Sequence, residues 1–259
     1  MLDEAVETVT LAGAPWAGLL VAATLPFRLA QVWFLDRLLE VGADASRYGN
    51  VLAEAADVTM LCFAIALAGR AVYARACGLA ITSRGIPGRE AWRVPAAALA
   101  AYFLTMAFGV LITAAVALTV FGLALVSVYN GLAIGTMELN DRVGLFAPFR
   151  TLRRRASLKI PLVLTFVLFC ATIAAWANLV MGTYLLMTMS GAAGVAELPR
   201  AAALFSPSNR VFLLLTAAGA LLAVEPFRIA AYVVFIRKLG SEERGDDLRT
   251  WFRELQRAS

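Results

Sequence analysis

The longest apolar stretch of the chain contains no charged residue for 44 positions, from Val94 to Met137. A helix rises about 1.5 Å per residue, so this stretch would form a rod of roughly 66 Å, about twice the ~30 Å hydrocarbon thickness of a bilayer. The pattern therefore predicts two membrane crossings joined by a tight turn. We place that turn near Thr119 to Gly122, a segment with almost no polar side chains.

Further apolar segments extend this hairpin to an all-α, polytopic bundle of six transmembrane helices. Pro15 and Pro26 lie in the first segment, where a proline is expected to kink or break the helix. The second segment is free of charge only from Val58 to Gly69, which is too short to cross a bilayer, so charged side chains at its ends must reach the interfaces. The predicted spans cover residues 9–34, 51–74, 95–118, 121–137, 160–187 and 209–236.

The distribution of basic residues predicts the orientation of the bundle. The segments 70–93, 138–159 and 237–259 hold 5, 6 and 6 of the Lys and Arg residues, whereas the segments predicted to lie on the opposite side hold few. Because basic residues accumulate on the cytoplasmic side of a membrane, both termini are expected in the cytoplasm. We accordingly predict a transmembrane domain over residues 1–239 and a cytoplasmic tail over residues 240–259.

Composition supports the membrane class and narrows the chemistry. The chain is 61% hydrophobic and 16% charged, which is too apolar for an ordinary soluble domain. Its net charge of +5 is explained by basic residues beside apolar spans, so nucleic acid is not expected as a partner. The chain has no histidine and three widely spaced cysteines, and we therefore expect neither a metal site nor a cofactor.

Charged residues inside a predicted span are the first candidates for a site, because burying a charge in hydrocarbon is costly unless it is paired or hydrated. Glu225 and Arg228 lie three positions apart in the sixth span, and Arg70 is expected at a similar depth in the second. The structural interpretation is an ion pair of Glu225 with Arg70 or Arg228. The functional interpretation is a polar site along a cavity or pathway that also includes Asn130 and Glu138.

Small and amide residues occur at helical spacing in two spans. Asn130, Gly131 and Gly135 lie in the fourth span, and Asn178 and Gly182 lie in the fifth. Such residues let transmembrane helices approach closely and form hydrogen bonds between helices. We interpret them as helix-packing positions.

A Pro-Phe-Arg tripeptide occurs three times, beginning at Pro26, Pro148 and Pro226. An internal repeat would explain the three copies, but a tripeptide recurs easily by chance. The predicted topology also places the first and third copies toward opposite sides of the membrane. We therefore favour chance over duplication.

Two segments are candidates for surface contacts. Arg153, Arg154 and Arg155 form a basic run that the orientation of the bundle alone would explain, and that is also suited to anionic lipid headgroups. In the tail, apolar residues recur at i, i+3, i+4 and i+7, which predicts an amphipathic helix that lies on the inner leaflet or docks to a protein partner. These apolar positions are Leu248, Trp251, Phe252 and Leu255.

Three stretches of the chain resemble a group of bacterial multipass proteins related to the glycerophosphodiester phosphodiesterase membrane domains. They are Leu25-Pro26-Phe27, Glu138 followed by Phe149-Arg150-Thr151-Leu152-Arg153-Arg154, and Pro226 followed by the segment from Arg237 to Leu248. The ending Arg244-Gly245-Asp246-Asp247-Leu248 keeps the Gly and Asp-Leu of the group but lacks its Glu. The resemblance implies a six-helix module of the bacterial inner membrane without a catalytic domain.

These observations favour a non-enzymatic membrane scaffold or accessory subunit, in contact with anionic lipid and with other membrane proteins. The alternative is a transporter, channel or lipid-handling protein that uses the buried charges near Glu225. An intramembrane enzyme is the least favoured class, because the chain lacks histidine, HExxH, GxSxG and P-loop motifs.

Overall fold

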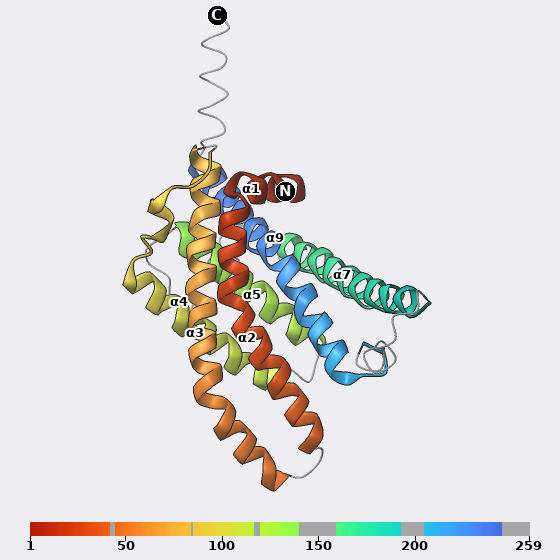
Figure 1. Cartoon of the computed structure of the whole chain (residues 1–259). Coiled ribbons are helices and arrows are strands. Elements are labelled where there is room, and N and C mark those ends of the chain that lie inside the picture. Colours follow the sequence, from red (N-terminus) through yellow and green to blue (C-terminus); the bar gives the residue numbers. More distant parts are fainter. Residues whose placement is uncertain (42–44, 84, 117–119, 140–158, 193–204, 245–259) are drawn as a thin grey trace, which may run out of the picture. The chain divides into compact units, whose positions relative to one another are not determined.

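A computed structural model describes the chain in residues 1–41, 45–83, 85–116, 120–139, 159–192 and 205–244. Every regular element in these residues is helical (Figure 1). The prediction of an all-α fold is therefore confirmed for the described part of the chain. The elements are α1 (Leu2–Ala12), α2 (Ala14–Val41), α3 (Ala45–Ser83), η1 (Arg89–Trp92), α4 (Ala96–Val116), α5 (Val120–Leu139), α7 (Lys159–Ala192) and α9 (Arg210–Arg244).

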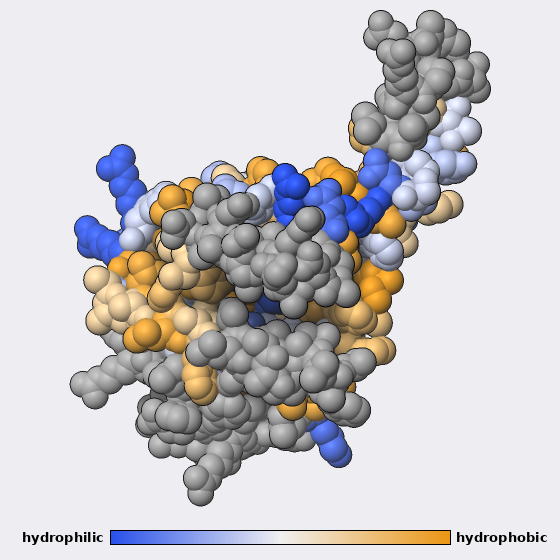
Figure 2. Space-filling view, turned by 90° about the horizontal axis from the view of Figure 1, so that it is seen from below, coloured by the Kyte–Doolittle hydropathy of each residue, from blue (hydrophilic) through white to orange (hydrophobic). Residues whose placement is uncertain are grey.

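Four of the helices are long and apolar enough to cross a membrane, namely the segments Ala14–Arg37, Thr59–Ser83, Lys159–Met189 and Arg210–Ser241. Helices α4 and α5 contain shorter described apolar segments, Ala96–Phe108 and Leu125–Thr136. Apolar residues cover much of the coloured surface in Figure 2, as expected of helices that face lipid. The count of six spans and their orientation stay predictions.

Contacts between Cα atoms divide the chain into two compact units. The first unit comprises residues 1–17, 70–166 and 227–259, and the second comprises residues 18–69 and 167–226. Helices α2, α3, α7 and α9 each contribute to both units.

The first predicted span begins in the wrong place. Helix α1 ends at Ala12 and α2 begins at Ala14, because Gly13 between them adopts a φ of 85°, a left-handed conformation that glycine accepts readily. Pro15 lies in the first turn of α2, where a missing N–H leaves no helical hydrogen bond unmade. Pro26 lies inside α2, which nevertheless continues to Val41 without a break.

Helix α3 extends much further than the second predicted span. It reaches Ser83, so the predicted cytoplasmic loop from Arg70 is helical over its first 14 residues, 70–83. Tyr73, Cys77 and Ala80 are fully buried in this part, and their spacing places them on one helix face. Burial of that face explains why the helix continues despite its arginines.

The predicted turn at Thr119 to Gly122 is also partly wrong. Helix α5 begins at Val120, so three of the four predicted turn residues are helical, while Thr119 lies outside the described residues. Helix α4 spans Ala96–Val116 and packs against α5 in the first unit. The predicted fourth span thus begins one residue too late and ends two residues too early.

In the first unit, α5 and α9 approach closely through glycines. A Cβ atom added at Gly131 would collide with the ring of Tyr232, and one added at Gly135 would lie 2.6 Å from Ile236 Cγ1 and 2.8 Å from the carbonyl oxygen of Tyr232. The Tyr232 hydroxyl lies 2.6 Å from Thr165 Oγ1 in α7. Small residues thus allow α5 to pack directly on the aromatic side chain of α9.

Helix ends are joined by polar contacts in the first unit. The Lys238 ammonium of α9 lies 2.8 Å from a carboxylate oxygen of Glu4 in α1. One residue earlier, Arg237 Nη1 donates a hydrogen bond of 2.6 Å to Thr82 Oγ1 in α3. The start of the chain, the end of α3 and the last turns of α9 therefore lie at the same end of this unit.

In the second unit, α2 packs beside α3. The rings of Phe27 and Phe63 lie 5.2 Å apart between centroids and are inclined by 48°. A Cβ atom added at Gly69 would collide with Ala23 of α2, so glycine allows the two helices to approach. These contacts hold the mid-part of α2 against α3.

We predict that Gly131→Ala destabilises the protein by about 1–3 kcal/mol, because the added methyl group must displace the buried Tyr232 ring. Gly18→Ala is the matched control, since a Cβ atom at Gly18 meets no atom within 4 Å. Thermal unfolding in detergent should show a lower midpoint for Gly131→Ala and an unchanged or higher one for Gly18→Ala. Equal midpoints for the two variants would contradict the close packing of α5 and α9.

The Glu4–Lys238 contact predicts a small effect of acid on stability. The Lys238 ammonium lowers the pKa of the Glu4 carboxyl below its ordinary value of 4.5. A carboxyl with a lowered pKa stabilises the fold above its unfolded pKa, and this contribution disappears as the pH falls through the folded value. Unfolding midpoints of wild type and Glu4→Gln should therefore differ at pH 6 and converge below pH ~4, with a difference under about 1 kcal/mol because the pair is half exposed.

Candidate functional site

The second unit contains a buried ion pair between two long helices. Arg28 Nη2 of α2 lies 3.5 Å from Glu225 Oε2 of α9, and the two side chains are 11% and 3% exposed. Arg28 Nη1 also donates a hydrogen bond of 2.8 Å to Gln31 Oε1, one turn further along α2. A carboxylate, a guanidinium and an amide therefore meet inside the protein.

This geometry changes the expected partner of Glu225. The ion pair described for Glu225 is with Arg28, which lies inside the first predicted span, 9–34, and inside α2. Pairing of Glu225 with Arg70 or Arg228 stays a prediction. Arg28 also belongs to the first Pro-Phe-Arg copy, and Glu225 directly precedes the third, so the ion pair brings the first copy next to the start of the third.

Burying the Arg28–Glu225 ion pair costs free energy. Each ion loses its hydration when it is buried, and mutual attraction offsets this loss only if the geometry is good and further hydrogen bonds are formed. Removal of one partner would leave the other charge buried and uncompensated, which costs about 3–5 kcal/mol. A pair of this kind is retained either because it determines which helices pack together or because its charges act on a ligand.

Prolines lie beside both charged residues. Pro26 is two positions before Arg28, and Pro226 directly follows Glu225. Proline has no N–H group, so it cannot donate the usual helical hydrogen bond to the residue four positions earlier. The carbonyl groups of Ala22 and Leu222 therefore lack that donor, although α2 and α9 are both continuous helices. Backbone carbonyls of this kind are potential acceptors near the ion pair.

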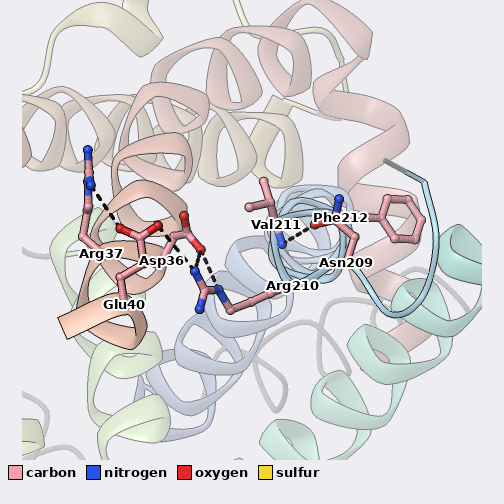
Figure 3. Close-up of polar contacts among 7 residues, drawn as sticks. All are labelled: Asp36, Arg37, Glu40, Asn209, Arg210, Val211 and Phe212. Carbon is pink, nitrogen blue, oxygen red and sulfur yellow. Dashed lines mark hydrogen bonds and ion pairs between the residues drawn. The ribbon is translucent and has the colours of Figure 1, made fainter. Parts of the chain in front are cut away.

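A second polar cluster of the same unit joins the end of α2 to the start of α9 (Figure 3). The Arg210 guanidinium points at Asp36, with Nε and Nη2 at 2.7 and 2.6 Å from Oδ1, and lies 3.8 Å from Glu40. Asn209 caps α9, because its Oδ1 accepts hydrogen bonds of 3.0 and 3.4 Å from the N–H groups of Val211 and Phe212. These contacts bring two antiparallel helix ends together at the protein surface.

The other predicted site residues occupy the first unit or lie outside the described residues. Arg70 is buried in α3, while Arg228 of α9 and Asn130 of α5 are half-buried. Glu138 belongs to α5, but its side chain is outside the described residues. The surface candidates also lie outside them, namely Arg153, Arg154, Arg155, Leu248, Trp251, Phe252 and Leu255.

Asn178 is a polar residue within the apolar helix α7. Asn178 is exposed, and its Nδ2 donates a hydrogen bond of 2.8 Å to the carbonyl oxygen of Ala174 within the same helix. The side of α7 that faces α9 is different, because there Trp176 Nε1 donates a hydrogen bond of 3.1 Å to Thr216 Oγ1. Asn178 is thus an exposed amide whose described hydrogen bond stays within its own helix.

Within the described residues there is no group of three His, Cys, Asp or Glu side chains placed to hold a metal ion. Comparison of the chain with protein-family profiles, curated proteins and solved structures finds no match. The resemblance to the glycerophosphodiester phosphodiesterase membrane-domain group therefore stays a prediction. The candidate site is defined by geometry alone.

A double-mutant cycle should measure the Arg28–Glu225 pair. We expect Glu225→Gln and Arg28→Met each to lower stability in detergent by about 3–5 kcal/mol, because each leaves a buried charge. The double variant should lose less than the sum of the two, since no uncompensated ion of the pair remains. Arg210→Gln serves as an exposed control with an expected loss below about 1 kcal/mol. Additive losses for Arg28 and Glu225 would show that the two side chains are not coupled.

Proposed function

We propose that the chain is a non-enzymatic scaffold or accessory subunit of a bacterial inner-membrane complex, with six transmembrane helices and both termini in the cytoplasm. The observation that carries this proposal is the surface of α7. A helix of 34 residues exposes large apolar side chains such as Phe169, Leu185 and Met189 together with the amide of Asn178. Lipid tails can cover the apolar side chains, but they offer no donor to the amide oxygen of Asn178, whereas a protein partner can.

The polar contacts elsewhere agree with a structural role. Ion pairs link α2 to α9 and α1 to α9. Such contacts determine which helices pack together, and this role involves no substrate. The absence of histidine and of recognised catalytic motifs from the sequence is consistent with this role.

Contacts at the cytoplasmic face complete the proposal. The basic run Arg153 to Arg155 is suited to anionic headgroups at about 1 kcal/mol per residue near the surface. The apolar positions of the tail, from Leu248 to Leu255, form a second surface for the inner leaflet or for a partner. Both segments are assigned from the sequence alone.

A transporter or lipid-handling protein is the second candidate, and the Arg28–Glu225 pair favours it. Buried charges beside helix-interior prolines are common along transport pathways, where carbonyls released by the prolines help to bind ions. If the protein is a transporter, water must reach the Arg28–Glu225 pair. A cysteine introduced at Gln31 in a cysteine-free background would then react in membranes with a charged, water-soluble thiol reagent, whereas a purely structural pair would leave it unreactive.

Purification from native membranes in a mild detergent should test the scaffold proposal. We expect the wild-type chain to copurify with another membrane protein in a fixed ratio, and a variant that lacks residues 248–259 to lose part of this partner. Thr188→Val is a control variant that should keep the partner. The Thr188 hydroxyl already donates a hydrogen bond of 2.8 Å to the carbonyl of Tyr184 in its own helix, so its loss removes no contact with another protein. Recovery of the chain with lipid alone, together with a reactive cysteine at position 31, would favour transport instead.

A further inference from the structure

One face of α7, the teal helix in Figure 1, carries a stripe of exposed residues. The six residues of this stripe recur along α7 at intervals of three, four, four, three and four positions, which places them on one side of the helix. All six are exposed, and we refer to them as the α7 stripe: Ala171, Ala174, Asn178, Gly182, Leu185 and Met189.

The opposite side of α7 is already used within the second unit. Trp176 donates its hydrogen bond to Thr216 of α9, and a Cβ atom at Gly219 of α9 would lie 3.5 Å from Leu179 Cδ1. At 100° per residue, Trp176 lies about 160° around the helix from Asn178 and Leu179 about 100°. The α7 stripe therefore faces away from α9 in this unit.

Asn178 makes an all-lipid environment for the stripe unfavourable. The segment Lys159–Met189 has its centre at residue 174, so Asn178 lies four residues, about 6 Å, beyond the centre of the span. One of its N–H groups is bonded to Ala174, but within the described part of the chain its carbonyl oxygen accepts no hydrogen bond. A polar group without a partner in hydrocarbon costs several kcal/mol, and lipid tails provide no donor.

We propose that the α7 stripe is the interface of a homodimer in which the two Asn178 side chains hydrogen-bond to each other. Two copies inserted in the same direction are related by a twofold axis along the membrane normal, so each residue of the stripe meets its counterpart at the same depth. A carboxamide contains both a donor and an acceptor, and it is therefore complementary to itself. A second copy satisfies Asn178 without any further polar residue.

The neighbours of Asn178 allow the close approach that this hydrogen bond requires. Ala174 and Gly182 lie one turn before and one turn after it on the same face. A Cβ atom at Gly182 would meet no atom within 4 Å, so the glycine leaves open space at the surface rather than filling an internal contact. Small residues four positions apart are typical of close helix pairs in membranes, here with an amide between them.

The dimer deepens the proposed scaffold role and rests on it for the membrane placement of α7. Disulfide cross-linking in native membranes tests it, in a background where Cys62, Cys77 and Cys170 are replaced by alanine. Leu185→Cys lies on the stripe, and Tyr184→Cys is its matched control, because Tyr184 is the adjacent residue, is also exposed and points about 100° away. Mild oxidation should give at least fivefold more dimer for Leu185→Cys than for Tyr184→Cys.

Adding Asn178→Leu to Leu185→Cys should lower the dimer fraction at least threefold, whereas Asn178→Gln, which keeps the amide, should retain most of it. Equal cross-linking of positions 184 and 185, or no effect of Asn178→Leu, would overturn the dimer. Capture of a different protein by Leu185→Cys would also overturn it while leaving the scaffold role intact. Folding of each variant is checked by a single symmetric peak in detergent gel filtration.

Discussion

Hydrocarbon provides no hydrogen bonds, and this constraint organises most of the polar contacts described here. Threonines inside the helices donate to carbonyls one turn earlier, as Thr24 does to Leu20 at 2.7 Å and Thr105 to Ala101 at 2.7 Å. The Arg28–Glu225 pair obeys the same rule with charged groups, because each residue provides the partner that lipid cannot. Asn178 is an exposed position where the rule is met only in part, and for that reason it indicates where a further protein surface belongs.

The α5–α9 contact of the first unit and the α2–α9 contact of the second bring helices together by different means. In the first, shape dominates: Gly131 and Gly135 of α5 leave room for Tyr232 and Ile236 of α9. In the second, the α2–α9 contacts include charges, both buried at Glu225 and exposed at Arg210. Close packing depends on van der Waals contact and tolerates little change in volume, whereas a charge pair tolerates changes in shape but not the loss of one partner. Substitutions at the α5–α9 and α2–α9 contacts should therefore destabilise the protein for different reasons.

Apolar periodicity predicted the helical class and placed several ends well, since α4 covers Ala96–Val116 where residues 95–118 were expected. It failed where a single residue or a distant contact decides the outcome. The break at Gly13 depends on one backbone angle, and the extension of α3 to Ser83 depends on burial of Tyr73 and Cys77. The sequence singled out Glu225 as a buried charge, but Arg28 is nearly 200 positions away, and no local pattern records which helices become neighbours.

The lengths of α3 and α9, 39 and 35 residues, correspond to rods of about 58 and 52 Å. A membrane interior of ~30 Å cannot contain either rod unless it is steeply tilted, so a substantial part of each extends past the hydrocarbon as helix. The hydrogen bond between Thr82 and Arg237 joins these rods near their ends. At that end the two helices are fastened to each other by a side-chain hydrogen bond, so a force that displaces the last turns of one helix also acts on the other.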